Sequence, residues 1–250
     1  MRTEHTHSLK QKMVRGRVLD CTNCSLAETC TKPVPGSYGR KTGGILIIGE
    51  APGHSEDKAN VPFVGQAGKL LQELTDMVDI KRQWLSYCNT VSCRPPNNRN
   101  PSKAEMSACA NNLRMQVSAV RPHVIVPLGA VPLSRFRVDM KISWDRGRPF
   151  VDMERRAIIL PSYHPSYVLR QRSAEDMLRG DLRQAKDRFL KYAKESFESA
   201  AYDWPEDCHR PNCKEDVDKY DYDGVAFCLN HWTEGKSYKP AREMTLEGTV

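Results

Sequence analysis

Four cysteines from three separate segments have the spacing of a metal or cluster site. Cys21 and Cys24 are separated by two residues, and Cys93 and Cys109 bracket a polar loop further along the chain. Thiolates are soft ligands that favour iron–sulfur clusters or zinc over hard cations. Disulfides are rare in reducing compartments, so ligation is the better explanation for the nine cysteines of this chain. Four such thiolates can enclose a cubane cluster, but their spacing alone does not choose between iron–sulfur and zinc.

A second group of candidate ligands lies towards the C-terminus and combines three cysteines with a histidine. Cys208 and Cys213 form one short knuckle, and Cys228 with His231 forms another. Three thiolates and an imidazole fit a closed tetrahedral zinc site. His209 is a rival fourth ligand, and free cysteines in an unstructured tail are the alternative. The pattern favours Zn²⁺.

The stretch GEAPGHSEDKANVPFVGQAGKLL, residues 49–71, has the composition of a binding loop. It follows a short, charge-free apolar run at 44–48, which indicates a strand buried on both faces of a parallel sheet. Ligands of open α/β sheets bind outside the carboxyl ends of the strands, so the turn at Gly49–Gly53 is a candidate site. No Gly-Lys-Ser/Thr follows, which excludes a phosphate-binding P-loop. Phe63 offers a ring face, so we expect a flat ligand.

The elements that position these residues alternate along the chain. Apolar runs predict strands at 44–48, 84–91, 123–129 and 157–160. The intervening segments predict helices at 66–78, 102–120 and 174–198, the second with Ser102 as N-cap and Glu105 three residues later. Alternating strands and helices predict an α/β fold, a three-layer α/β/α sandwich with a mainly parallel four-stranded sheet.

The composition divides the chain into three parts. Residues 1–20 form a basic leader, either helical or loose, and residues 21–199 form the α/β domain. Residues 200–250 form a small Cys/His module, too short to fold alone without a staple such as zinc, and they are a candidate surface for a protein or DNA partner.

Bulk properties narrow the functional class. The formal charge of +7 favours a polyanionic partner such as nucleic acid, although it also fits a role in solubility alone. No apolar run approaches the ~20 residues of a membrane span, and the charged N-terminus does not resemble a secretory signal. We therefore expect a cytoplasmic protein with no membrane partner.

Several motifs together resemble the family 4 uracil-DNA glycosylases. These are the loop at 49–71, NTVSCRPPNNRNPSKAEMSAC, RPHVIVPLG and HPSYVLR, in the order of that family, and the resemblance spans about residues 21–191. It implies a four-stranded parallel α/β sandwich, a [4Fe–4S] cluster and excision of uracil from DNA in base-excision repair. The cluster ligands it implies are Cys21, Cys24, Cys93 and Cys109. Cys30 and Cys88 match no ligand position.

The resemblance also implies a pocket for an extruded base. A glycosylase flips its target nucleotide out of the duplex and reads it in a pocket. Phe63 offers a stacking face, with core packing as its alternative role. Asn89 carries a donor and an acceptor that complement N3–H and O4 of uracil, and the resemblance places the uracil-reading Asn here. Cytosine presents the reverse pattern and would leave buried polar groups unpaired.

Cleavage of the glycosidic bond places negative charge on the departing base and positive charge on the sugar. His164 in HPSYVLR is the candidate donor to uracil O2, and backbone amides of the turn at Gly49–Gly53 add further donors. Glu50 is the candidate to orient water or stabilise the oxocarbenium ion, as proposed for the family, with a hydrogen-bonded loop carboxylate as the alternative. The expected substrate contacts are Gly49, Ala51, Gly53, Phe63, Asn89, Ser166 and Arg170.

Two features of the motifs remain open. Ser166 and Arg170 are expected beside the flipped nucleotide and its phosphates, although Pro165-Ser166 also fits a helix start. Asn60 stands where many family members have Gly. None of the candidate residues is a lysine, so we expect a monofunctional hydrolase without lyase chemistry.

Two hypotheses compete with uracil excision. One is the same fold acting on another modified pyrimidine in phage or defence biology; a domain of certain phage DNA polymerases is similar to this chain. The other is a non-catalytic DNA-binding or assembly module that works through residues 200–250.

Overall fold

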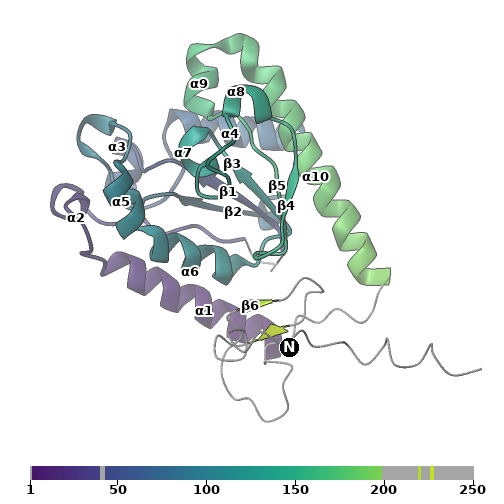
Figure 1. The fold of residues 1–250 in the computed structure, drawn as a ribbon, viewed down its shortest axis with the longest axis horizontal. Helices are drawn as coiled ribbons and strands as arrows, with labels where there is room; N and C mark the ends of the chain where they lie inside the picture. The colour runs from purple at the N-terminus through teal and green to yellow at the C-terminus, as the bar shows by residue number, and fades with distance from the viewer. Residues whose placement is uncertain (1, 40–42, 199–218, 221–225, 228–250) are drawn as a thin grey trace, which may run out of the picture. The chain divides into compact units, whose positions relative to one another are not determined.

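The computed structural model describes residues 2–39, 43–198, 219–220 and 226–227 (Figure 1). The longer helices are α1 (Arg2–Leu19), α4 (Gln66–Met77), α6 (Ala110–Val120) and α10 (Glu175–Glu198). The shorter ones are α2 (Leu26–Thr29), α3 (His54–Ala59), α5 (Lys103–Ala108), α7 (Ala130–Leu133), α8 (Ile142–Asp145) and α9 (Pro165–Arg170). Short 3₁₀ turns cover Arg82–Trp84, Pro96–Asn98 and Arg172–Ala174.

The main sheet confirms the predicted α/β class and adds one strand. Its order is β2-β1-β3-β5-β4, and the β1–β2, β1–β3 and β3–β5 pairs are parallel. Its strands are β1 (Ile45–Gly49), β2 (Leu85–Asn89), β3 (Val124–Pro127), β4 (Phe150–Asp152) and β5 (Ala157–Ile159). We predicted four strands, and β4 is the additional one. It is short, lies at the sheet edge and is only partly buried, so it lacks the apolar run that marked the others.

The two faces of the sheet are covered by different helices. Ile45 and Ile47 of β1 pack with α4, α9 and α10, whereas Leu46 and Ile48 pack with α6. Successive strand residues point to opposite faces, so a strand that is apolar at every position requires cover on both. The result is the predicted three-layer arrangement, visible in Figure 1 as helices on either side of the sheet.

The predicted helix at 102–120 is interrupted at Cys109. This residue is the C-cap of α5 and the N-cap of α6, and its sulfur accepts a hydrogen bond from the Ser92 N–H at 3.3 Å. The predicted cap is confirmed, because Ser102 Oγ accepts from the Glu105 N–H and Glu105 returns a bond to the Ser102 N–H. Helix periodicity predicted the span, but it did not reveal the break that turns the thiol inward.

The first segment of the chain is helical. Val14 and Val18 of α1 are buried against Ala119 of α6, so this face of α1 joins the hydrophobic core. Because α1 ends two residues before Cys21, and α6 begins directly after Cys109, this packing links two of the cysteine-bearing segments.

Contacts divide the chain into two compact units: Met1–Val151 with Ala157–Ala193, and Asp152–Arg156 with Lys194–Val250. In the second unit β6 (Lys219–Tyr220) pairs antiparallel with β7 (Ala226–Phe227). The predicted zinc ligands Cys208, Cys213, Cys228 and His231 lie outside the described residues, so that site stays a prediction.

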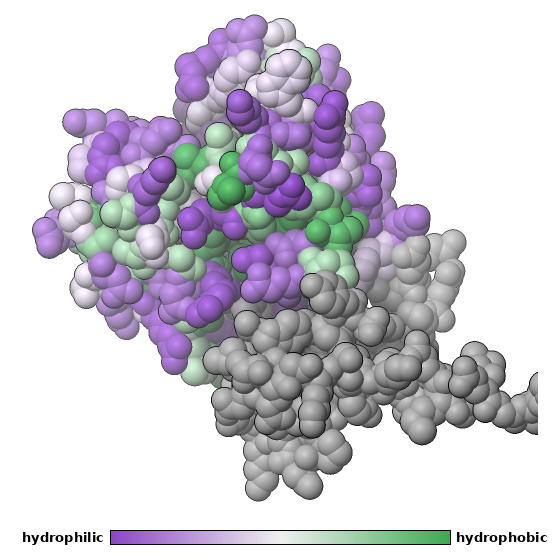
Figure 2. Space-filling view, viewed as in Figure 1, coloured by the Kyte–Doolittle hydropathy of each residue, from purple (hydrophilic) through white to green (hydrophobic). Residues whose placement is uncertain are grey.

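The surface of the described residues is largely polar. Figure 2 shows hydrophilic residues over most of the coloured face, with hydrophobic ones in small groups between them. Among the described helices, none is long and apolar enough to cross a membrane.

Candidate active site

The segments that follow four strands meet at one edge of the sheet. Gly49 at the end of β1 is paired in register with Asn89 at the end of β2. On the other side of β1, the Leu128 N–H donates to Ile48 O at 2.9 Å, and Leu128 in turn bridges to Ser162 after β5. Parallel strands therefore bring the motifs at 49–71, 89–93, 127–129 and 162–170 to the same carboxyl edge.

The Phe63 ring lies directly over this edge. A Cβ at Gly49 would overlap both the Asn89 carboxamide oxygen and the Phe63 ring, so these three residues are in contact only because position 49 is glycine. A Cβ at Gly68 would likewise overlap the Phe63 carbonyl. Phe63 has φ of 56°, a left-handed conformation that is unfavourable for an aromatic residue. Such strain clusters at functional sites, and here two glycines make room for it.

Asn89 is buried with its amide group free. Its residue exposure is 6%, yet none of the described residues hydrogen-bonds to its side chain. Its amide oxygen and nitrogen are not among the fully buried polar atoms that lack a partner in the described part of the chain, so the amide reaches solvent at this edge. Thr90 instead takes the local backbone acceptor, with its N–H and hydroxyl both donating to Gly49 O. The Asn89 donor and acceptor are therefore available to a ligand, with the Phe63 ring beside them.

Glu56 holds the loop that carries Phe63, and the sequence analysis did not identify it. Its carboxylate accepts from the N–H groups of Gly53, Val64 and Gly65 at 3.1, 3.0 and 2.7 Å. The carboxylate thus joins the start of α3 to the loop before α4. The Gly53 N–H, which we expected to contact the substrate, donates to Glu56 instead.

Replacing Glu56 with Gln is expected to destabilise this loop. The amide keeps one acceptor oxygen but presents an NH₂ group where the other oxygen accepted a backbone N–H. We expect a loss of about 1–3 kcal/mol in the free energy of unfolding, measured by chemical denaturation. Glu73→Gln on the exposed face of α4 is the matched control and should change little. Equal effects from both variants would contradict the assigned role of Glu56.

His164 is held in one orientation by the helix that follows it. The residue is the N-cap of α9, and its Nδ1 accepts the Ser166 N–H at 3.1 Å. Burial, with the nearby charge of Arg170, lowers the pKa of His164 to about 4, while Glu56 opposes this effect. A neutral imidazole that accepts at Nδ1 carries its proton at Nε2. His164 is thus a hydrogen-bond donor of fixed tautomer at neutral pH.

Ser166 and Arg170 both belong to α9. The Ser166 N–H caps onto His164, so the helix-start reading of Pro165-Ser166 describes this local structure. Arg170 is exposed in the last turn, and its charge acts on His164. Two other arginines, Arg99 and Arg146, form ion pairs with Glu105 and Asp181.

Glu50 is half-buried directly after β1. Its backbone carbonyl accepts the Val91 N–H at 3.2 Å, and none of the described residues hydrogen-bonds to its carboxylate. Burial raises the pKa of Glu50, which makes the carboxylate a stronger base. The alternative reading as a hydrogen-bonded loop carboxylate therefore fits Glu56 rather than Glu50.

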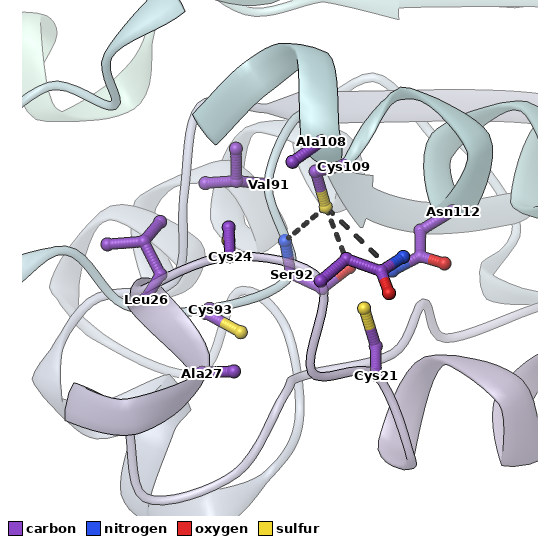
Figure 3. A pocket seen from close by; sticks show the side chains of 11 residues that line it. Cys21, Cys24, Leu26, Ala27, Val91, Ser92, Cys93, Ala108, Cys109 and Asn112 are labelled. Carbon is purple, nitrogen blue, oxygen red and sulfur yellow. Dashed lines mark hydrogen bonds between the residues drawn. The ribbon is translucent and has the colours of Figure 1, made fainter. Parts of the chain in front are cut away.

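The four predicted cluster ligands line one pocket beside this edge. Cys21 and Cys24 come from the segment after α1, Cys93 from the segment after β2, and Cys109 from the α5–α6 junction. In Figure 3 the sulfur atoms of Cys21, Cys93 and Cys109 point into the space between these segments. Burial raises the pKa of the Cys93 and Cys109 thiols. Ala51 packs against the same cluster of residues.

The four thiols do not converge on one point. Within the described part of the chain, no three His, Cys, Asp or Glu side chains are close enough to hold a single metal ion. In a cubane cluster each thiolate binds a different iron, so the ligand sulfurs surround the cluster. Four thiolates are a donor set that iron–sulfur clusters use.

The segment that follows the first two cysteines is connected through α3 to the loop that carries Phe63. Asp57 is buried and accepts from the Thr31 N–H at 2.9 Å and the Thr31 hydroxyl at 2.7 Å. Asn60 Nδ2 donates to Pro33 O at 2.8 Å. Asn60 has φ of 54°, in the left-handed region that asparagine and glycine tolerate better than other residues.

Fold and site together define an α/β protein whose strand ends carry Phe63 and Asn89 beside a pocket lined by four thiols. The family model for the uracil DNA glycosylase superfamily matches residues 36–194, and the chain belongs to that superfamily.

Three relatives are named type-4 uracil-DNA glycosylases. The protein of Thermotoga maritima is 43% identical over 173 residues, which is 68% of this chain and 89% of that protein. The protein of Sulfurisphaera tokodaii is 35% identical over 70% of this chain and 82% of its own length. The protein of Saccharolobus solfataricus is 34% identical over 70% of this chain and 84% of its own length.

Proposed function

We propose that this chain is a monofunctional uracil-DNA glycosylase that hydrolyses the bond between uracil N1 and deoxyribose C1′ in DNA, leaving an abasic site. The Asn89 carboxamide, beside the Phe63 ring and without a hydrogen-bond partner among the described residues, is the observation that carries the proposal. The names of the relatives support it and favour it over the two competing hypotheses. Residues 21–199 form the glycosylase part in this proposal.

Base recognition follows from the Asn89 amide. Its oxygen accepts from uracil N3–H and its NH₂ donates to uracil O4, while Phe63 stacks on the ring. Cytosine has an acceptor at N3 and a donor at N4, so both bonds would be replaced by unfavourable pairs. Sites that hydrogen-bond their substrate in this way reject a mismatched analogue strongly, because their buried polar groups are left unpaired.

Catalysis uses the charge separation of the reaction. The bonding pair of N1–C1′ leaves with the base, and the His164 Nε2–H stabilises the negative charge that develops at uracil O2. Glu50 lies on the sugar side, where its carboxylate stabilises the oxocarbenium ion and accepts a proton from the water that adds to C1′. The products are an abasic deoxyribose and a uracil anion, which takes up a proton after release.

The cofactor in this proposal is a [4Fe–4S] cluster held by Cys21, Cys24, Cys93 and Cys109. These four thiolates would hold the cluster between three segments of the chain, where it would serve as a structural cross-link with no redox step required. The Asp57 and Asn60 hydrogen bonds would carry this cross-link to the loop that holds Phe63.

Release of free base from matched oligonucleotides tests the proposal. Oligonucleotides with a single uracil, 5-hydroxymethyluracil or thymine in one sequence context should yield free uracil and little of the other bases. Preferential release of a different pyrimidine would favour the rival glycosylase activity. DNA binding with no base release would favour the non-catalytic module.

A further inference from the structure

Asp181 on α10 is a buried carboxylate outside the residues assigned above. Its side chain is 5% exposed, and both of its oxygens are engaged. Oδ1 accepts from Arg146 Nη1 at 2.7 Å, and Oδ2 accepts from the Ser162 hydroxyl at 2.6 Å. A buried ion pair is weak evidence for stability, because desolvation offsets the Coulomb attraction. The geometry that the pair imposes on its neighbours is therefore of more interest.

Ser162 is the residue through which Asp181 reaches the candidate site. It is fully buried, and both its backbone N–H and its carbonyl are hydrogen-bonded to residues at the end of β3. Its N–H donates to Pro127 O at 3.1 Å, and its carbonyl accepts the Gly129 N–H at 2.8 Å. The Asp181 bond fixes the side chain as well. Ser162 lies two residues before His164, so its position sets the start of the segment that carries the imidazole.

Arg146 holds the same segment from a second direction. Its guanidinium lies over the Tyr163 ring, 5.5 Å from the ring centre. The next residue, Gly147, donates its N–H to Pro161 O at 2.8 Å. Gly147 has φ of 71°, and a Cβ there would lie 2.9 Å from Asp181 Oδ1, so this approach requires glycine. In Figure 1, α8, α9 and the start of α10 lie together around this segment.

We propose that Asp181 and Arg146 are positioning residues for uracil excision, which fix the His164 imidazole through Ser162 and Tyr163. The inference rests on the proposed function, because it assigns the pair to the donor at uracil O2. Neither residue touches the base in this account. A small displacement of a catalytic group, on the order of 1 Å, can cost about 100-fold in rate.

A double-mutant cycle with His164 tests this inference. Single-turnover excision and DNA affinity are measured for the full chain carrying Asp181→Asn, His164→Ala or both. Asp181→Asn alone should slow excision by about 10- to 100-fold while DNA affinity changes by less than about threefold. In the His164→Ala background, the same substitution should cost less than about threefold, because the group it positions is gone.

Two further variants separate positioning from folding. Asp176→Asn is the matched control on α10, since Asp176 is exposed and contacts only Arg179 among the described residues. It should excise at the wild-type rate. Ser162→Ala removes one hydrogen bond but keeps the Asp181–Arg146 pair. If Asp181→Asn does not fold, this variant measures the coupling between the Asp181–Ser162 contact and His164 instead. It should slow excision in the wild-type background and have little effect in the His164→Ala background.

The outcomes are distinct. If His164→Ala is slow, and if Asp181→Asn or Ser162→Ala slows excision equally in the wild-type and His164→Ala backgrounds, the positioning role alone is overturned. A wild-type rate for His164→Ala overturns the catalytic role of His164, and the positioning role with it.

Discussion

Replacing His164 with alanine is expected to slow uracil excision by about 10²- to 10³-fold, the usual cost of losing one donor to a developing oxyanion. The imidazole is neutral and accepts the Ser166 N–H at Nδ1, so its single N–H is at Nε2. That donor acts mainly in the transition state, when charge reaches uracil O2. The loss should therefore appear in the single-turnover rate constant, with little change in DNA affinity.

The helix-capping role of His164 requires its own control. Loss of an N-cap side chain destabilises a protein by about 1 kcal/mol, which would reduce activity only modestly. His164→Asn retains an acceptor for the Ser166 N–H but places its donor differently. We expect this variant to recover the melting temperature and to remain slow in excision. Full recovery of both properties would show that His164 acts only as a cap.

The pH dependence follows from the lowered pKa of His164. In the folded protein the His164 ring has a pKa of about 4, whereas in the unfolded chain it has its ordinary pKa of 6.5. His164 therefore makes the free energy of unfolding fall as pH decreases from 6.5 to 4. Its contribution to excision should be constant between pH 8 and 6. A rate that halves near pH 6.5 in the wild type but not in His164→Asn would contradict the lowered pKa of His164.

Replacing Cys109 with serine is expected to remove the proposed iron–sulfur cluster. This thiol is buried at the break between α5 and α6 and faces the pocket with the other three cysteines. Hard serine oxygen is a poor substitute for thiolate on iron. We expect iron content and visible absorbance near background, a lower melting temperature, and at least ~10-fold slower excision, the scale seen when even an outer-shell metal partner is lost.

Cys88→Ala is the matched control for this experiment. Cys88 is equally buried, but it packs in the core against α6 and is not among the residues that line the pocket. The variant should keep its iron even if its melting temperature falls. Equal loss of iron from both variants, or full iron in Cys109→Ser, would contradict the ligand assignment.

Continuous apolar runs were enough to predict the parallel sheet, and the carboxyl ends of its strands then predicted where the site lies. The β-branched runs at 44–48 and 123–129 marked buried parallel strands, whereas the pairing of Asn89 with Gly49 is known only from the structure. The resemblance supplied the roles of Asn89 and His164. Edge strand β4 was missed because three partly exposed residues carry no comparable signal.

The sequence did not predict how these side chains are held. Phe63 has a positive φ that no aromatic residue signals, and the two glycines that make room for it, Gly49 and Gly68, lie 14 residues before it and five residues after it. Glu56 and Asp181 act through long-range contacts to backbone groups and a buried serine, which periodicity does not encode. A glutamate three residues after Gly53 resembles a capping pattern, the one local signal that Glu56 offered.

A crystal structure of the protein with free uracil tests the central claim most directly. The account predicts uracil stacked on Phe63, with N3–H and O4 bonded to the Asn89 carboxamide and O2 within hydrogen-bonding distance of His164 Nε2. Cytosine under the same conditions should leave the pocket empty. Uracil bound elsewhere, or bound here with its O4 edge away from Asn89, would contradict the account.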